Sequence, residues 1–225
     1  MSRNIIVTGA AGALGAAVVE KFKREGYHVI ALVKPDANEV SEEADVTYEV
    51  DVTDEEAVAD FVKEYQIQFG ELDAIAMIVG GFAMGNLEST TQKELNRMFQ
   101  LNFFSSFSMV SGFLSLFKKQ QHGTFLFVGA RPALQLKDGT GTVAYALSKN
   151  LVISLSEIVA EEVKGTDIRT HVFVPSIIDT PANREAMPDS DFSKWVNPAD
   201  IAEAMHYAVN TPALRQMTFK LYGGV

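Results

Sequence analysis

Tyr145 and Lys149 stand four positions apart, in the run Tyr-Ala-Leu-Ser-Lys, within a stretch whose apolar pattern predicts a helix over 144–164. Positions i and i+4 share one face of a helix, so the phenol and the ammonium point the same way. A nearby cation favours phenolate and lowers the pKa of a tyrosine. The pair is therefore suited to general acid chemistry, with the tyrosine donating a proton during a reduction.

A second candidate site is the small-residue turn Thr8-Gly-Ala-Ala-Gly-Ala-Leu-Gly15. It follows a short apolar strand predicted over 5–7 and opens a helix predicted over 13–24. Small residues let the backbone approach a pyrophosphate, whose charge a helix N-terminus stabilises. The spacing is G-x-x-G-x-x-G rather than the usual G-x-G-x-x-G. The residues expected to bind a dinucleotide here are Gly9, Ala11, Gly12, Leu14 and Gly15.

These residues need a scaffold, and the chain alternates apolar strands with helices throughout. Strands are predicted over 5–7, 28–33, 48–50, 74–79, 124–128, 170–174 and 217–221, and helices over 13–24, from 54 onward, and over 98–117, 144–164 and 198–210. This alternation predicts one doubly wound parallel sheet of about seven strands, with helices on both faces. No linker or repeat interrupts it, so residues 1–225 are expected to form a single domain. Ligands of such a sheet lie outside the carboxyl ends of its strands.

The predicted helix over 98–117 carries no charge and contains six phenylalanines. Asn102 and five serines in the same stretch are costly in lipid, which argues against a membrane span. We expect a helix buried on most of its circumference, against its own sheet and against a second subunit. The sequence thus predicts a homodimer or tetramer through this helix and the Tyr145 helix.

Composition excludes several classes of function. The chain has 19 Lys and Arg against 29 Asp and Glu, a net charge of −10, which disfavours nucleic-acid and membrane partners. The absence of cysteine excludes disulfides and thiolate chemistry, and the four histidines lack the spacing of metal ligands, so no metal is expected. The N-terminus does not resemble a signal peptide, so we expect a cytoplasmic protein that acts on a small molecule.

Together these motifs resemble the short-chain dehydrogenase/reductase family over nearly the whole chain. The resemblance implies that Tyr145 donates the proton, that Lys149 binds the nicotinamide ribose and lowers the tyrosine pKa, and that Asn102 holds a water in a proton relay. It also implies further contacts with an NAD(P) cofactor. Those residues are Asp51 and Val52 at the adenine, Gly80 and Gly81 on the adenosine side, and Pro175, Ile178 and Thr180 after the sixth strand, of which Ile178 and Thr180 would meet the carboxamide.

One residue of the family pattern is missing. The serine that precedes the tyrosine by thirteen residues is replaced at that count by Pro132, and the run Val128-Gly-Ala-Arg131 has no hydroxyl. This serine normally hydrogen-bonds a substrate oxygen as it gains charge. Thr140 or Thr142 is an alternative donor if the loop folds back.

A narrower resemblance, to the quinoid dihydropteridine reductases of that family, accounts for the gap. It is carried by the runs 12–15 and 79–83 and above all by 179–195. Those enzymes keep the tyrosine and lysine without the serine, and protonate a ring nitrogen of a quinonoid pterin. Asn102 departs from their pattern and follows the wider family. Alternative functions are reduction of another small carbonyl or imine compound, or dinucleotide sensing without catalysis.

The end of the second strand bears on the choice of cofactor. Val33-Lys34 stands where the pterin reductases carry an acid that binds the adenosine ribose. An acid repels a 2′-phosphate, whereas a lysine attracts it, so the sequence favours NADP(H) over NAD(H). A shifted turn that brings in Asp36 is the alternative.

Four residues are candidates for contact with the substrate: Phe82, Ala130, Arg131 and Trp195. Arg131 would supply a cation beside the missing serine. Trp195 either forms an aromatic wall over a flat substrate or simply anchors its loop to the core.

Overall fold

The computed structural model describes residues 3–35 and 43–224 and has the predicted architecture. A single parallel sheet has seven strands in the order β3-β2-β1-β4-β5-β6-β7. The strands are β1 Asn4–Thr8, β2 His28–Val33, β3 Val46–Glu49, β4 Ala74–Met77, β5 His122–Val128, β6 Asp167–Pro175 and β7 Gln216–Leu221. The chain reverses direction across the sheet between β1 and β4, the position at which such sheets bind their ligands.

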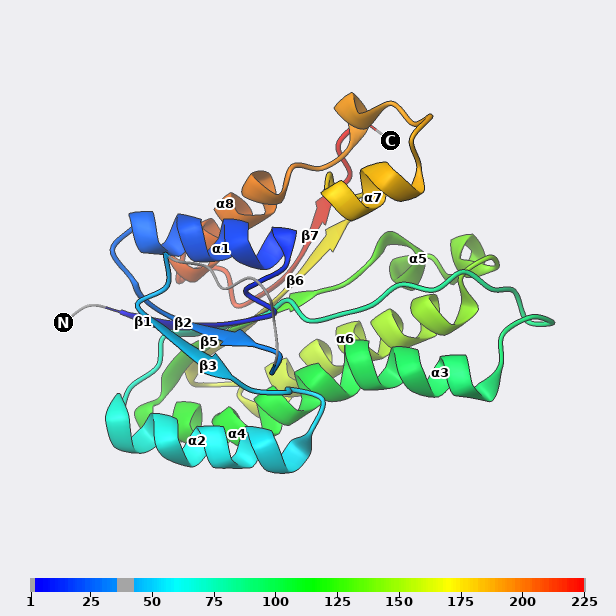
Figure 1. Ribbon diagram of the computed structural model, residues 1–225. Helices are drawn as coiled ribbons and strands as arrows, with labels where there is room; N and C mark the ends of the chain where they lie inside the picture. Colours follow the sequence, from blue (N-terminus) through cyan, green and yellow to red (C-terminus); the bar gives the residue numbers. More distant parts are fainter. Residues whose placement is uncertain (1–2, 36–42, 225) are drawn as a thin grey trace.

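Helices cover both faces of this sheet (Figure 1). On one face lie α1 Ala13–Arg24 and α8 Pro198–Val209, and on the other α2 Glu55–Gln68, α4 Ser105–Gln120 and α6 Val143–Glu162. The strands read as continuous apolar runs because both of their faces are buried: every residue of β4 is buried, and all of β2 and β5 except the first.

The phenylalanine-rich segment differs from the single helix predicted over 98–117. Helix α3 begins earlier, at Gln92, and ends at Met98; a π-helical turn, η1, covers Phe99–Phe104, and α4 continues to Gln120. Within a single chain, its phenylalanines are buried to different extents. Phe113 and Phe117 are fully buried, but Phe104 and Phe107 are 44% and 42% exposed.

Four short helical elements were not predicted: α5 Arg131–Leu134, the 3₁₀ turns η2 Leu136–Gly139 and η3 Phe192–Lys194, and α7 Pro181–Ala186. They are too short to show helical periodicity. Helices α5 and α7 and the end of the chain gather at the edge where β5, β6 and β7 finish (Figure 1). Short helices and the end of the chain therefore border the sheet at this edge.

The helix α6 is long and apolar enough, by composition, to cross a membrane, and half of its apolar window is buried inside the protein. It packs on the sheet through residues such as Val152 and Val159. This burial is typical of a core helix.

Candidate active site at the carboxyl ends of the strands

The small-residue turn between β1 and α1 is built so tightly that two of its glycines are required. Gly9 has a φ of +64°, which side chains other than glycine rarely adopt. A Cβ on Gly15 would overlap the carbonyl oxygen of Gly9 and lie 2.8 Å from the Cα of Ala10. The turn therefore brings backbone against backbone at the start of α1.

The same turn fits a pyrophosphate. Gly12 is the N-cap residue of α1 and offers no side-chain oxygen to the amides of the first turn, and both Gly12 and Ala13 are exposed. Uncapped amides at the positive end of a helix bind anions. Ala11 is half-buried at this turn, while Leu14 is buried and belongs to the core between α1 and the sheet.

At the predicted adenosine end, Lys34 is exposed directly after β2 and Asp51 lies near it after β3. Hydrogen bonds from Thr53 and the charge of Lys34 hold the pKa of Asp51 below its usual range. Val52 is buried in the core beside this acid. Asp36, the alternative ribose ligand, lies outside the described residues.

Gly80 and Gly81 follow β4 and meet Asn102 from η1. The Asn102 side chain accepts from the Gly81 amide at 2.9 Å and donates to the Gly81 carbonyl oxygen at 3.1 Å and to Ser148 Oγ at 2.9 Å. A Cβ on Gly80 would lie 2.7 Å from Asn102 Oδ1 and 3.0 Å from Lys149 Nζ. Gly80 therefore lets the Asn102 and Lys149 side chains approach the backbone at the end of β4 more closely than any larger residue would allow.

Lys149 is buried, and its ammonium donates to the carbonyl oxygen of Val128, at the end of β5, at 2.9 Å. Burial disfavours the charged form and lowers the pKa of Lys149 to about 8. The α6 helix thus places this cation against the carboxyl end of a central strand.

Tyr145 lies one turn earlier on α6, and its ring meets the edge of the exposed Phe82 ring at 5.0 Å between centroids. Burial raises the pKa of Tyr145 to about 12. The pKa of Tyr145 thus lies above its usual value, not below it as the spacing to Lys149 predicted, because desolvation of the phenol dominates. The phenol keeps its proton at neutral pH.

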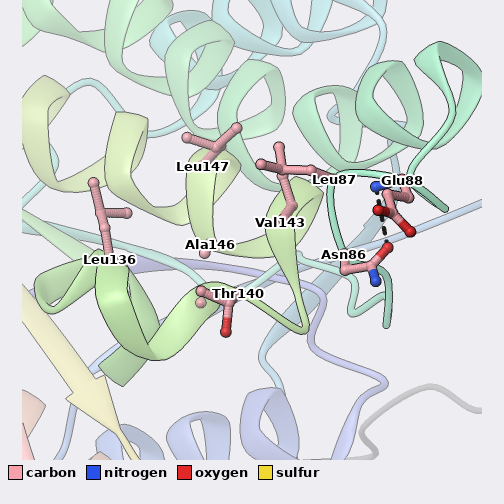
Figure 2. A pocket seen from close by; sticks show the side chains of 9 residues that line it. Asn86, Leu87, Glu88, Leu136, Thr140, Val143, Ala146 and Leu147 are labelled. Atoms are coloured by element: carbon pink, nitrogen blue, oxygen red, sulfur yellow. Dashed lines mark hydrogen bonds between the residues drawn. The ribbon is translucent and has the colours of Figure 1, made fainter.

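Ala130 is buried at the N-cap of α5, in the cluster against which Tyr145 packs. Neither threonine proposed as a substitute donor is shown next to the tyrosine. Thr140 lines a hollow of 490 Å³ with Leu136, Val143 and Leu147, which neither Tyr145 nor Lys149 lines (Figure 2). The Thr142 hydroxyl is buried without a hydrogen-bond partner among the described residues.

The chain after β6, from Pro175 onward, forms a fixed wall rather than an open loop. Ile178 pairs with Val196 in a single bridge, and its carbonyl oxygen accepts from Asn183 Nδ2 at 2.8 Å. Thr180 caps α7 through the Asn183 amide at 3.2 Å. Arg184 forms a bidentate pair with Asp179, at 2.6 and 2.7 Å.

Trp195 anchors this wall. It is 7% exposed and packs against Phe192 at 4.7 Å between centroids, over which the Arg184 guanidinium also lies. The structure favours the anchoring role of Trp195 over an aromatic wall facing a substrate.

Arg131 stands beside Ala130, half-buried, with its guanidinium carbon 5.2 Å from the centroid of the Tyr222 ring. Tyr222 was not among the predicted site residues. It follows the last strand, and only the pairing of β7 with β6 brings it to this edge.

The family of the chain follows from its sequence as well as from this site. A family model described as short chain dehydrogenase matches residues 3–191. The protein belongs to the short-chain dehydrogenase/reductase family and is an oxidoreductase of that class.

Individual relatives are more distant. A dihydropteridine reductase of Dictyostelium discoideum is 29% identical over 208 residues, covering 91% of this chain and 87% of the relative. A diacetyl reductase of Staphylococcus epidermidis is 25% identical over 189 residues, covering 80% and 73%. Among solved structures, ElxO with NADP bound superposes with a TM-score of 0.87 at 21% identity, over 100% of this chain and 98% of that one. The structural similarity to ElxO shows that this chain has the same fold as that protein.

Proposed function

We propose that the protein is an NADP(H)-dependent reductase of a quinonoid dihydropterin. The observation that carries the proposal is the pairing of Tyr145 and Lys149 on α6 next to a strand end, residues 128–131, that offers no side-chain hydroxyl. A substrate that gains a proton on a ring nitrogen develops no alkoxide, and so needs no second donor to an oxygen.

The cofactor, when bound at the α1 turn and along Gly80 and Gly81, supplies the hydride. Tyr145 holds the proton that the reduced substrate takes up, and its pKa of about 12 keeps it in the acid form at neutral pH. When the phenol gives up that proton, the Lys149 ammonium, one helical turn away, stabilises the negative charge left behind. Asn102 accepts a hydrogen bond from the Gly81 amide and donates one to the Gly81 carbonyl oxygen. These two bonds hold the loop after β4 in place.

The name of the Dictyostelium relative supports the choice of substrate, as does the run 179–195, which the structure folds into the wall anchored by Trp195. Lys34 supports the choice of NADP(H), because its exposed charge lies at the predicted ribose site, which Asp51 borders. One structural neighbour, ElxO, holds NADP, which agrees with that choice.

A second candidate is reduction of a small carbonyl compound. The retention of Asn102, which is typical of the wider family, and the name of the diacetyl reductase relative favour it. The two candidates differ in whether a donor to the substrate oxygen is needed.

A cofactor-oxidation assay over a quinonoid pterin, diacetyl and a panel of ketones tests both. We expect the quinonoid pterin to be reduced fastest by the wild type. Ala130→Ser restores the hydroxyl: it should leave pterin reduction almost unchanged and improve reduction of ketones. A large gain on the best wild-type substrate would show that an oxygen donor had been missing, and would overturn the pterin assignment.

A further inference from the structure

Arg131 differs from the other arginines because its guanidinium has no hydrogen-bond acceptor among the described residues. The sequence has seven arginines, all within the described ranges. Six of them donate to a carboxylate, amide or carbonyl oxygen: Arg3, Arg24, Arg97, Arg169, Arg184 and Arg215. Arg131 alone has no acceptor among residues 3–35 and 43–224, and no carboxylate there lies within 4.0 Å of it.

Its position adjoins the catalytic pair. Arg131 begins α5 directly after the buried Ala130, three residues beyond the Val128 carbonyl oxygen that accepts from Lys149. Arg131 therefore lies on the same strand-end segment, residues 128–131, that Lys149 contacts.

Tyr222 completes the surroundings of Arg131. Its ring lies under the guanidinium, and its hydroxyl is buried without a hydrogen-bond partner in the described part of the chain. Its carbonyl oxygen accepts from Ser176 Oγ at 2.7 Å, and the Gly224 amide donates to the Lys194 carbonyl oxygen at 2.9 Å. These bonds fix Tyr222 between Arg131 and the wall formed by residues 176–196.

Stacking on a tyrosine does not account for the site by itself. A guanidinium uses its face against a ring, while its five N–H donors lie in its plane and stay available. A half-buried guanidinium whose in-plane donors have no acceptor among the described residues matches a planar, singly charged carboxylate, which accepts two parallel bonds from a guanidinium.

We propose that Arg131, whose guanidinium lies over the ring of Tyr222, binds a carboxylate carried by the substrate. This inference rests on the proposed reductase function and narrows its substrate to small oxidised compounds that bear an acidic group. The carboxylate would be held on the β5 and β7 side of Tyr145, which orients the rest of the molecule toward the phenol and Lys149.

Binding without turnover tests the proposal directly. The NADP⁺-saturated protein is titrated with 6-carboxypterin and 6-methylpterin, two stable pterins that differ in the acidic group. Phenylglyoxylate and acetophenone form a second pair that does not depend on a pterin ring. We expect each carboxylate to bind more tightly than its neutral partner, by roughly tenfold to a hundredfold for a charge-assisted contact.

Variants identify the residues responsible. Arg131→Gln should bring the ratio of the two dissociation constants close to one, and Arg131→Lys should keep part of the ratio. Tyr222→Leu, which removes the ring under the guanidinium, should reduce the ratio, whereas Tyr222→Phe, which keeps that ring, should not. Arg215→Gln is the matched control, because it removes the same charge at the opposite end of the strands, where Arg215 pairs with Asp167. The melting temperature of each variant shows whether it is folded.

The outcomes separate this inference from the proposed function. A carboxylate preference that Arg131→Gln abolishes supports the site, even if no pterin is reduced. No preference in either pair, or a preference that Arg131→Gln leaves intact, overturns it. Fast reduction of a neutral quinonoid pterin together with that result would leave the reductase function standing and the carboxylate site refuted.

Discussion

The ammonium of Lys149 donates to the carbonyl oxygen of Val128 at 2.9 Å, so the strand end of β5 fixes the cation that lies one helical turn from Tyr145. A carbonyl oxygen orients this lysine without neutralising it, in contrast to a carboxylate. Burial then lowers the pKa of Lys149 to about 8, close to the working pH of many enzymes. The charge beside the tyrosine is consequently sensitive to pH.

We therefore expect kcat/KM to fall as pH rises through about 8, because Lys149 loses the charge that stabilises phenolate. A pH profile from about 6.5 to about 9.5 measures this directly. Lys149→Arg keeps the charge and should move the fall to higher pH. A wild-type profile that stays flat through this range would contradict the assignment of this role to Lys149.

Replacing Tyr145 with Phe removes the proton but leaves the α1 turn intact. General acid catalysis supplies about 10²–10⁴-fold, so turnover should fall by that order. The NADPH dissociation constant, measured by fluorescence titration, should barely change. Phe82→Leu is a useful comparison, since it alters only the ring that contacts Tyr145. Near-normal turnover in Tyr145→Phe would remove the tyrosine from the mechanism.

Lys34→Ala tests the cofactor preference. A lost charge-assisted contact should weaken NADPH binding by roughly tenfold to a hundredfold and leave NADH binding unaffected. Lys34→Arg, which keeps the charge, should retain most of the preference. If the wild type binds NADH more tightly than NADPH, the interpretation of the end of β2 is wrong.

The subunit contact remains a prediction, and exposed apolar side chains on α4 and α6 suggest where it lies. Phe107 on α4 and Leu147 on α6 are 42% and 41% exposed, and burial of such side chains contributes roughly 1.5–3 kcal/mol each. Sedimentation should give a mass at least twice the 24.6 kDa of one chain. Phe107→Glu should reduce it, whereas Tyr207→Glu on α8 should not. A wild-type mass of one chain at micromolar concentration would contradict the prediction.

His171 on β6 should make the fold sensitive to acid. It is fully buried with neither ring nitrogen partnered among the described residues, and desolvation, aided by the nearby Arg169, lowers its pKa to about 4. The unfolded chain binds a proton at about 6.5 and the folded one does not, so the free energy of unfolding decreases as pH falls from about 6.5 to about 4. The loss is about 3 kcal/mol.

His171→Leu removes this proton uptake. Urea unfolding at about pH 7 and about pH 4.5 should show a smaller loss of stability in the variant than in the wild type. Equal losses in the two proteins would assign acid sensitivity to other groups.

The alternation of apolar strands with helices was enough to predict the sheet, because buried parallel strands must be apolar on both faces. The glycine turn and the spacing of Tyr145 and Lys149 could also be predicted from the sequence, since each depends on residues that are close together in the chain. The π-helical turn η1 was not predicted; within it Asn102 reaches across to Gly81 and Ser148, and no local sequence pattern records those contacts.

Burial and long-range pairing were decided by the tertiary structure alone. Desolvation of Tyr145 outweighs the lysine one turn away, which reverses the pKa shift that local spacing predicts. Trp195 became an anchor because Phe192 and the chain end pack around it. Tyr222 meets Arg131 only because β7 pairs with β6. The sequence alone determined the chemical groups and the sheet, whereas packing between distant segments decided their protonation and their neighbours.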